Sequence, residues 1–338
     1  MQTALLACGL ALLVSIASVL LVRRHAVALK MIASVNERSS HKAPTPTGGG
    51  VGIAAGSLCG WGILWAIGFQ QAAVLCVACG ALAVLGFMDD RSPLSARLRL
   101  VIQFGACALV AAMLVPAIPT EVFGSLSLLI VLAAALPVLL WWVNLFNFMD
   151  GIDGLAASQA LFMAGGAMIL AWLQVPEAYA QPLFFGFAVI ALSTLGFLLF
   201  NWPPATIFMG DAGSLFLALG LAALALCALA AEWLSLGQCL ALASVFVIDA
   251  SVTLARRLLR GHSPAAAHRS HFYQRLSRRW GGARPVTLTA TAINVGIVLP
   301  CAYAVGQFES VGLWLVALLY GTGIAIAILG GAGQDENG

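Results

Sequence analysis

Six aspartates stand beside long apolar runs, where a carboxylate can carry out chemistry. A carboxylate at the end of an apolar segment is costly to desolvate, so it is normally paired, bound to a metal or open to a water-filled cavity. Such groups can hold a divalent cation or accept a proton. The six candidates are Asp89, Asp90, Asp150, Asp153, Asp211 and Asp249.

The first two candidates, Asp89 and Asp90, are followed directly by Arg91. Adjacent carboxylates repel each other, which favours a shared counter-charge such as a divalent cation or a proton. We therefore assign both to the candidate catalytic residues. A solvated helix end that Arg91 neutralises is the alternative interpretation.

The segment 144–156 reads NLFNFMDGIDGLA, and its polar residues recur at every third position. Asn144, Asn147, Asp150 and Asp153 would therefore lie near one face if the segment is helical. The glycine after each aspartate allows a ligand to approach the backbone closely. We therefore count these four residues among the candidate site residues, with the two aspartates as candidate catalytic groups. For Asp153 alone, capping of the next helix would be sufficient.

A third acidic motif, FMGDAGS, places Asp211 among glycines at an expected helix start. It follows Asn201 and a Pro-Pro pair, which interrupt the preceding apolar run. A carboxylate in this setting suits the hard cation Mg²⁺, whose other ligands can be substrate phosphates, and Mn²⁺ could substitute for it. Helix capping by Asp211 is the alternative.

The loop 256–284 combines basic residues with histidines. His268 and His271 are three positions apart and could share a helical face, with Arg269 and Arg275 placed to bind a diphosphate. A basic loop that faces lipid headgroups would explain the arginines equally well. That alternative leaves the histidines unexplained.

These residues must be positioned by a bundle that spans a membrane. The chain has 338 residues, of which 62% are apolar and 9% charged, and its mean hydropathy is +1.00. A soluble domain is nearer a quarter charged. We predict an all-α, polytopic membrane protein with a single transmembrane domain over 1–338 and eleven spanning helices. The expected spans are 3–22, 51–69, 72–87, 98–118, 126–143, 154–173, 183–200, 214–231, 238–255, 287–306 and 311–330.

The basic residues also predict the orientation of the chain, because short loops rich in Lys and Arg stay in the cytoplasm. All of them fall in three stretches, 23–42, 91–99 and 256–284. The N-terminus is then outside and the C-terminus cytoplasmic, where the tail 331–338 is expected to be solvated. The loops that carry the candidate residues share the cytoplasmic face: 30–50, 88–99, 144–154, 201–214 and 256–286.

Several function classes are disfavoured by this pattern. Orientation already accounts for the basic clusters, so we expect no nucleic-acid partner. Cys76 and Cys79 form a C-x-x-C, but no second pair completes a metal site, so both are expected to be packing residues. A proton-coupled transporter is the rival to an enzyme, although it would place essential polar groups near the midplane. Only Asp249 comes close, and we expect it to be a pairing partner or a polar wall.

Carboxylates for a metal, cations for phosphate and an apolar body on one membrane face fit phosphoryl transfer between a nucleotide-bearing donor and a lipid phosphate. Five motifs, in order, resemble the polyprenyl-phosphate N-acetylhexosamine-1-phosphate transferases, a bacterial superfamily. They are the first loop around NERSSHK with Pro46 and Gly48–Gly50, then Phe87–Arg91, Asn144–Ala156, Asn201–Ser214 and Ala267–Leu276.

The resemblance implies a reaction at the cytoplasmic face of the bacterial inner membrane. Members transfer a sugar 1-phosphate from a UDP-sugar to undecaprenyl phosphate, release UMP and require Mg²⁺. By resemblance Asp211 would be the metal ligand, and Asp89 or Asp90 would deprotonate or orient the lipid phosphate. The loop from Asn144 to Asp153 would contact the nucleotide.

The resemblance assigns further substrate contacts outside the acidic motifs. Lys42 belongs to the first loop, and Arg97 stands where relatives often carry lysine. Asn201 would contact the nucleotide, and His271 would help bind the diphosphate. The resemblance also leaves a homodimer open.

The last motif departs from the family pattern. Many relatives read Asp-Arg-x-His-x-His-His, whereas this chain reads HRSHFYQ over 268–274. This loop is expected to face the sugar and the diphosphate, so the donor need not be UDP-N-acetylglucosamine. The chain looks more like the subgroup that initiates O-antigen or capsule synthesis, part of which uses deoxy sugars.

Overall fold

The computed structural model describes residues 1–33, 44–263 and 268–334. Within these ranges the chain is almost entirely helical, with one two-stranded antiparallel pair that joins β1 (Ile32–Ala33) to β2 (Thr45–Pro46). The α-helices are α1 Gln2–His25, α2 Gly50–Ala66, α3 Gln71–Arg91, α4 Ala96–Leu114, α5 Leu128–Phe148, α6 Leu155–Gln174, α7 Pro182–Asn201, α8 Asp211–Ala230, α9 Leu236–Leu259, α10 Phe272–Arg279, α11 Ala283–Ile293, α12 Leu299–Gln307 and α13 Glu309–Leu329. The prediction of an all-α fold is confirmed.

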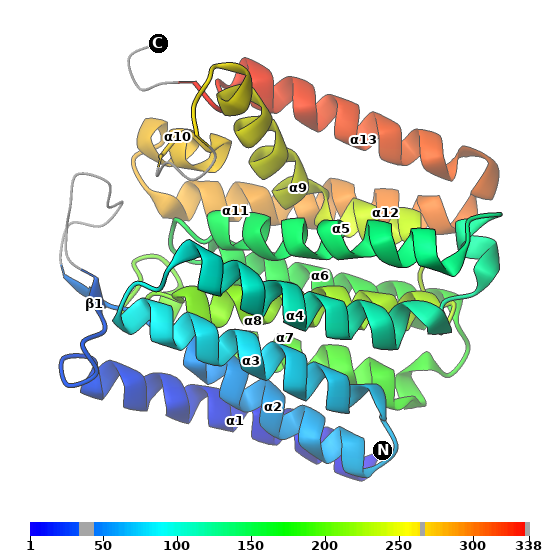
Figure 1. Cartoon of the computed structure of the whole chain (residues 1–338), viewed down its shortest axis with the longest axis horizontal. Helices are drawn as coiled ribbons and strands as arrows, with labels where there is room; N and C mark the ends of the chain where they lie inside the picture. The colour runs from blue at the N-terminus through cyan, green and yellow to red at the C-terminus, as the bar shows by residue number, and fades with distance from the viewer. Residues whose placement is uncertain (34–43, 264–267, 335–338) are drawn as a thin grey trace.

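The helices form a polytopic membrane bundle. In the described part of the chain, ten helical segments are long and apolar enough to cross a bilayer, and α2 is a shorter apolar helix of 17 residues. Together they match the eleven expected spans. The long helices run side by side, and α1 begins at the end of the bundle opposite to that where α13 ends (Figure 1). An odd number of crossings requires this arrangement.

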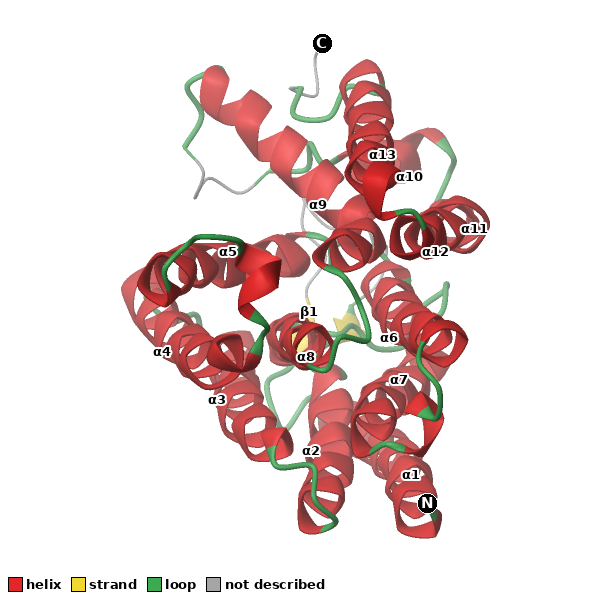
Figure 2. Cartoon of the chain, turned by 90° about the vertical axis from the view of Figure 1, so that its right-hand side faces the viewer, coloured by secondary structure: helices red, strands yellow, loops and turns green. Residues whose placement is uncertain are grey.

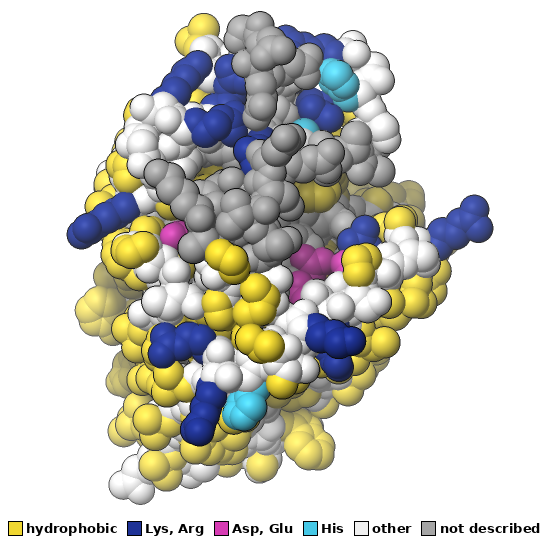
Figure 3. Space-filling model, turned by 90° about the vertical axis from the view of Figure 1, so that its left-hand side faces the viewer, with side chains coloured by type: hydrophobic (Ala, Val, Ile, Leu, Met, Phe, Trp, Pro, Cys, Tyr) yellow, Lys and Arg dark blue, Asp and Glu magenta, His cyan; other side chains and the backbone are white. Residues whose placement is uncertain are grey.

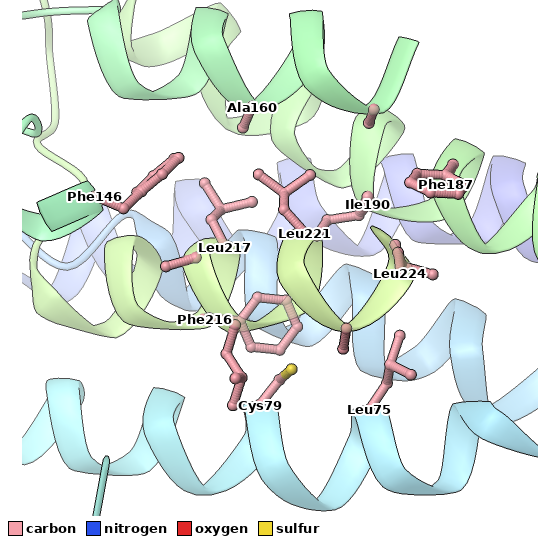
Figure 4. Packing of buried hydrophobic residues seen from close by; sticks show 14 of the residues in the cluster. Leu75, Cys79, Phe146, Ala160, Phe187, Ile190, Phe216, Leu217, Leu221 and Leu224 are labelled. Carbon is pink, nitrogen blue, oxygen red and sulfur yellow. The ribbon is translucent and has the colours of Figure 1, made fainter. Parts of the chain in front are cut away.

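Helix α8 forms the centre of the bundle, with α2 to α7 arranged around it and α9 to α13 gathered on one side (Figure 2). Its side chains are apolar on every face, as expected for a helix without a solvent face. Phe216 points toward Cys79 and Leu75 of α3, whereas Leu217 and Leu221 point to the opposite side (Figure 4). Because α8 is packed on all sides, Asp211, its first residue, is held firmly in place.

Helix α2 packs closely against its neighbours because it carries glycine at every fourth position. A side chain at Gly52 would meet Val19 of α1, and one at Gly60 would meet Val189 of α7 at 2.7 Å. Small residues at this spacing let helix backbones approach in membranes, where no hydrophobic effect drives helices together. The glycines of this segment therefore serve helix packing.

The span predicted at 287–306 is broken into three segments. Between α11 and α12 lies a π-helical turn, Asn294–Val298. Asn294 donates a hydrogen bond of 2.6 Å to Gln159 of α6, and both side chains are buried. Such turns re-aim a side chain inside a helix, and here the turn directs an amide into the bundle.

The prediction of a solvated tail is wrong for residues 331–334. Gly331, Ala332 and Gly333 are buried, and we call Gly330–Gln334 the C-terminal strap. Arg256 donates to the carbonyl of Ala332 at 2.6 Å, and the amide of Gly333 donates to Ser270 at 2.8 Å. The strap thus fastens the chain after α13 to the loop that precedes α10.

Candidate active site

Carboxylates from three helix ends meet at one end of the bundle. Asp89 and Asp90 close α3, Asp150 follows α5, and Asp211 opens α8. Asp150 interacts electrostatically with Asp211 and Asp90, and the Asp211 side chain is hydrogen-bonded to Asp89. Figure 3 views this end of the molecule and shows a patch of acidic side chains, a second, separate acidic spot, and Lys and Arg side chains on both sides. The structure therefore brings together four of the six candidate aspartates, whereas Asp153 binds Ala205 and Asp249 binds the start of α10.

Asp90 caps the N-terminus of α8 from a different helix. Its carboxylate accepts the amide of Asp211 at 2.9 Å and that of Ala212 at 3.3 Å. The first amides of a helix have no partner within the helix and favour a negative charge. Gly86 makes this contact possible, because any side chain there would collide with the backbone of Asp211 and Ala212. A glycine one turn before the aspartate pair thus lets α3 reach α8.

The capping role proposed as an alternative for Asp211 and Asp153 is wrong. The residues before α8 and α6, Gly210 and Gly154, carry no side-chain cap, and neither aspartate fills that place. The Asp211 side chain instead contacts Asp89 and the amide of Asn147.

Asp89 is paired with an arginine that the sequence analysis did not select. Arg99 of α4 donates to Asp89 at 2.9 Å, and the amide of Leu94 donates to the other carboxylate oxygen at 2.6 Å. Arg91, the expected partner, instead lies over the ring of Phe87 at 5.7 Å. Because α4 begins only a few residues after α3, a basic residue within its first turn could have been considered.

Asp150 lies in the turn between α5 and α6 and is half-buried. Burial raises the pKa of its carboxyl well above the ordinary value, and the nearby charges of Asp211, Asp90 and Asp153 raise it further. A carboxyl group with a raised pKa binds a proton more readily than an ordinary aspartate, as a general base must. This residue is therefore the strongest candidate for proton transfer outside the spanning helices.

Asp153 and Asn201 brace the loops behind the carboxylates. Asp153 accepts the amide of Ala205 at 2.9 Å, whereas Asn201 accepts from Gly154 at 2.9 Å and donates to Ile207 at 2.9 Å. Asn201 is 4% exposed and both its amide atoms are engaged. Its predicted contact with the nucleotide is therefore replaced by a structural role, and Asp153 holds the loop after α7.

The remaining predicted substrate residues are divided between the site and its surroundings. Asn147 reaches Asp211, whereas Asn144 turns toward α4 and donates to Gln103 at 3.0 Å. The regular three-residue spacing fails because α5 ends at Phe148 and the two aspartates follow in a turn. Arg97 is exposed at the start of α4, and Lys42 lies outside the described residues.

The triple glycine of the first loop docks onto the approach to α8. The amides of Gly49 and Gly50 donate to Phe208 and Met209 at 2.8 and 2.9 Å. A side chain at Gly50 would collide with the backbone of Gly213. Glycine is required because two backbones meet here, so this motif supports Asp211 from the side opposite α3.

The histidine loop is organised by Asp249 of α9. Its carboxylate accepts the amides of Phe272 and Tyr273, the first residues of α10, at 2.8 and 2.9 Å, and His271 Nδ1 lies 3.4 Å from Oδ1. The expectation that Asp249 is a pairing partner is confirmed. His268 and His271 do not share a helix, because α10 begins after them, but their rings lie 5.0 Å apart.

The loop 256–284 carries no acidic residue, and the nearby carboxylate of Asp249 belongs to α9. Partial burial lowers the pKa of His268 to about 4, with the charges of His271 and Arg257 adding to the effect, so the ring is neutral at pH 7. Arg269 has two buried nitrogens, Nε and a terminal amino group, that have no hydrogen-bond partner among the residues that the structure describes. Arg275 is 8% exposed and donates to the strap at Gln334. The loop therefore offers donors to an anion.

Comparison with known proteins gives one consistent result. A model described as Glycosyl transferase family 4 matches residues 72–229. A probable undecaprenyl-phosphate N-acetylglucosaminyl 1-phosphate transferase of Bacillus subtilis is 31% identical over 282 residues, which cover 79% of this chain and 76% of that protein. The chain belongs to the polyprenyl-phosphate hexosamine-1-phosphate transferase family.

Further relatives of this transferase agree. A decaprenyl-phosphate N-acetylglucosaminephosphotransferase of Mycobacterium tuberculosis is 30% identical, with 82% of this chain and 76% of that protein covered. An undecaprenyl-phosphate alpha-N-acetylglucosaminyl 1-phosphate transferase of Escherichia coli O157:H7 is 26% identical over 88% of this chain and 85% of its own length. The chain is thus an enzyme that transfers a phosphosugar, and the transporter alternative is not favoured.

The carboxylates of this transferase fit a divalent cation. In the described ranges no three His, Cys, Asp or Glu side chains already form a metal cage. Asp211 and Asp89 nevertheless lie in contact, and the repulsion between two adjacent carboxylates favours a proton or a cation between them. Mg²⁺ is commonly held by one or two carboxylates and completes its shell with water and substrate phosphates. Asp90 is less suited to this role, because both its oxygens cap α8.

Proposed function

We propose that this transferase moves an N-acetylhexosamine 1-phosphate from a UDP-sugar to undecaprenyl phosphate and releases UMP. The observation that carries the proposal is the meeting of four carboxylates from α3, α5 and α8 at one end of a membrane bundle. The basic histidine loop lies against the same end, where Tyr273 of α10 donates to Phe148 of α5 at 2.9 Å. The acids suit a cation and the loop suits a diphosphate, so both needs of phosphoryl transfer are met.

The reaction is a direct in-line displacement. An oxygen of the lipid phosphate attacks the β-phosphorus of the donor, and the bond from that phosphorus to the bridging oxygen breaks. UMP leaves with the bridging oxygen, and the lipid keeps the sugar on a new diphosphate. No covalent intermediate with an aspartate is required.

Each half of the site has its own part in this step. Asp211, with Asp89, would hold Mg²⁺ or Mn²⁺, which when bound neutralises the charge that spreads over the phosphate oxygens. Asp150 would hold or release the proton of the lipid phosphate, since burial keeps the pKa of its carboxyl high. Arg269 and Arg275 donate hydrogen bonds to the diphosphate, and His271 is oriented by Asp249.

The lipid acceptor is supported by an apolar cavity of about 240 Å³ beside the histidine loop. It is lined by apolar side chains of α9, α10, α11 and α13, among them Phe272, Ala290 and Ile326. We assign it to the first isoprene units of the acceptor. Ala290→Phe should raise the KM for undecaprenyl phosphate several-fold and leave the KM for the donor unchanged. An equal rise of both values would contradict this assignment.

We further propose that the site faces the cytoplasm of a bacterial inner membrane. The basic stretches 91–99 and 256–284 flank the site, and short basic loops stay on the cytoplasmic side. Cysteine labelling in intact cells tests this orientation. With native cysteines replaced, a cysteine at Arg279 should react only with a membrane-permeant maleimide and one at Glu121 with an impermeant reagent.

The donor sugar is proposed to be an N-acetylated deoxyhexosamine in a pathway that starts O-antigen or capsule. This rests on the HRSHFYQ sequence over 268–274, where two histidines of the family pattern are replaced. Purified enzyme should be given undecaprenyl phosphate and each member of a panel of radiolabelled UDP-sugars. Exclusive use of UDP-N-acetylglucosamine would end the deoxy-sugar proposal and leave the reaction class intact.

A further inference from the structure

Gly151, the residue directly after Asp150, is held against the hydroxyl group of Tyr273. A side chain built on Gly151 would collide with Tyr273 Oη, and its next contacts would be Tyr273 Cζ at 3.0 Å and Gln274 Nε2 at 3.1 Å. The glycine is therefore explained by a tyrosine more than 120 residues away in the sequence. This contact joins the histidine loop to the carboxylate turn.

The Tyr273 hydroxyl ties down both sides of Asp150. It donates to the carbonyl of Phe148, the last residue of α5, at 2.9 Å and accepts a hydrogen bond from the amide of Gly151. The last carbonyls of a helix have no partner within the helix, so an outside donor stabilises the helix end. One oxygen atom thus holds the peptide groups that precede and follow the Met149–Asp150 pair.

Tyr273 is itself held rigidly. Its amide donates to Asp249 at 2.9 Å, its ring stacks on His271 with centroids 5.6 Å apart, and the residue is 4% exposed. The hydroxyl is therefore a fixed point, and its position depends on the same aspartate that orients His271.

We propose that Tyr273 is a positioning residue for the transfer reaction, setting Asp150 in register with the histidine loop. It touches neither the reacting atoms nor the cation in this proposal, and acts only through the backbone of residues 148–151. The kinetic part of the test rests on the proposed function, whereas a structural readout is independent of it.

Tyr273→Phe removes only the hydroxyl oxygen, and Tyr320→Phe is its matched control. Tyr320 lies on α13 and donates to the carbonyl of Leu240 at 2.9 Å, the same bond away from the carboxylates. We expect Tyr273→Phe to lower kcat about tenfold, with both KM values changed less than twofold and the pH profile of kcat shifted. Tyr320→Phe should keep the wild-type kcat and pH profile. An unchanged kcat in Tyr273→Phe would overturn the proposal.

A double variant tests the geometry directly. Gly151→Ala should abolish most activity, because its methyl group collides with the hydroxyl. Gly151→Ala combined with Tyr273→Phe should be more active than Gly151→Ala alone, since the colliding atom is gone and the contacts of 3.0 and 3.1 Å require shifts of only a few tenths of an ångström. Simple additivity of the two losses would contradict the proposed contact.

Hydrogen exchange supplies the readout that needs no activity. Amides of a peptide covering 149–152 should exchange several-fold faster in Tyr273→Phe than in the wild type, and at the wild-type rate in Tyr320→Phe. If the wild-type enzyme transfers no sugar phosphate, the proposed function fails while exchange still decides the role of Tyr273. Equal exchange in all three proteins would refute that role.

Discussion

Two helices of this enzyme begin at a carboxylate that another helix supplies. Asp90 of α3 accepts the first two amides of α8, and Asp249 of α9 accepts the first two amides of α10. The geometry is nearly the same, but the surroundings are opposite. Asp90 stands among further carboxylates, whereas Asp249 has Thr253 and His271 beside it.

The difference shows how the same capping arrangement occurs in two complementary halves of the site, the acidic half around Asp90 and the histidine half around Asp249. Around Asp90 negative charge accumulates, and Arg99 pairs with Asp89 alone, so the half needs a cation. Around Asp249 the arginines of the histidine loop outnumber the single carboxylate, so this half has an excess of positive charge and suits an anion. A cation bound to a nucleotide diphosphate satisfies both halves at once.

Among the substitutions that test the two halves, Asp211→Ala should cause the largest loss of transfer activity. Asp211→Ala should reduce metal-dependent transfer about 10³-fold or more, because the acidic half loses the residue best placed to hold a cation. Radiolabelled transfer at saturating Mg²⁺ measures the loss, and thermal unfolding in detergent checks the fold. Glu121→Gln, an exposed change at the opposite end of the bundle, is the control. Near-normal turnover of Asp211→Ala would refute the metal assignment.

Substitution of the two capping aspartates compares the halves directly. Asp90→Asn and Asp249→Asn should each destabilise the protein by about 1–2 kcal/mol, since each weakens the cap of a helix. Transfer should fall about 10²-fold in Asp90→Asn and about tenfold in Asp249→Asn, because only Asp90 adjoins Asp211. Parallel unfolding and activity measurements test this. Equal losses of activity in the two variants would contradict the prediction that Asp90 matters more because it adjoins Asp211.

Removal of the C-terminal strap should weaken only the histidine half. A chain ending at Gly330 loses the bonds that the strap makes with Arg256 and Ser270, so the KM for the donor should rise several-fold. The KM for undecaprenyl phosphate should stay within twofold. A chain ending at Gln334 keeps all these contacts and serves as the control. An unchanged donor KM in the shorter chain would show that the strap does not position the loop.

The smallest effect is expected from the protonation of His268. The pKa of this ring is about 4 in the folded protein, below its ordinary value of 6.5, so the unfolded chain binds more protons between these values. Stability should therefore fall as the pH is lowered from about 6.5 toward 4 and stay flat above that window. His268→Gln should lose about 2 °C less in Tm than the wild type between pH 7.5 and 5. His25 is exposed at the end of α1, so His25→Gln should lose as much Tm between these pH values as the wild type.

Most of the fold could be predicted from the sequence, because spans and their order follow from local runs of apolar residues. The acidic half could be predicted as well, since Asp89, Asp150 and Asp211 each carry their own local motif. The caps could not, because Asp90 and its partner Asp211 are 121 positions apart. No local pattern distinguishes a carboxylate that holds a metal from one that holds a helix.

The histidine half was predicted only as a set of residue types. Nothing in the sequence distinguishes Tyr273 from other aromatic residues. Its positioning role depends on the hydrogen bond to Phe148, the residue at which α5 ends. Asn201 was assigned to the nucleotide by family resemblance, whereas its neighbours in space are the backbone groups of Gly154 and Ile207. The tail was assigned to solvent because it is short and polar and carries Asp335 and Glu336, although Gly331 and Gly333 are small enough to lie beside Arg275 and Thr253.

The position of the C-terminal strap has a consequence for biosynthesis. The carboxylates of α3, α5 and α8 belong to the first two thirds of the chain, and helices inserted early can pack while the ribosome is still translating. The loop before α10 already has its bonds to Asp249 of α9, but it gains the bond from Gly333 to Ser270 only when residues 331–334 have left the ribosome. The two halves of the catalytic face are therefore completed at different stages of translation, and the half that needs an anion is the last to be assembled.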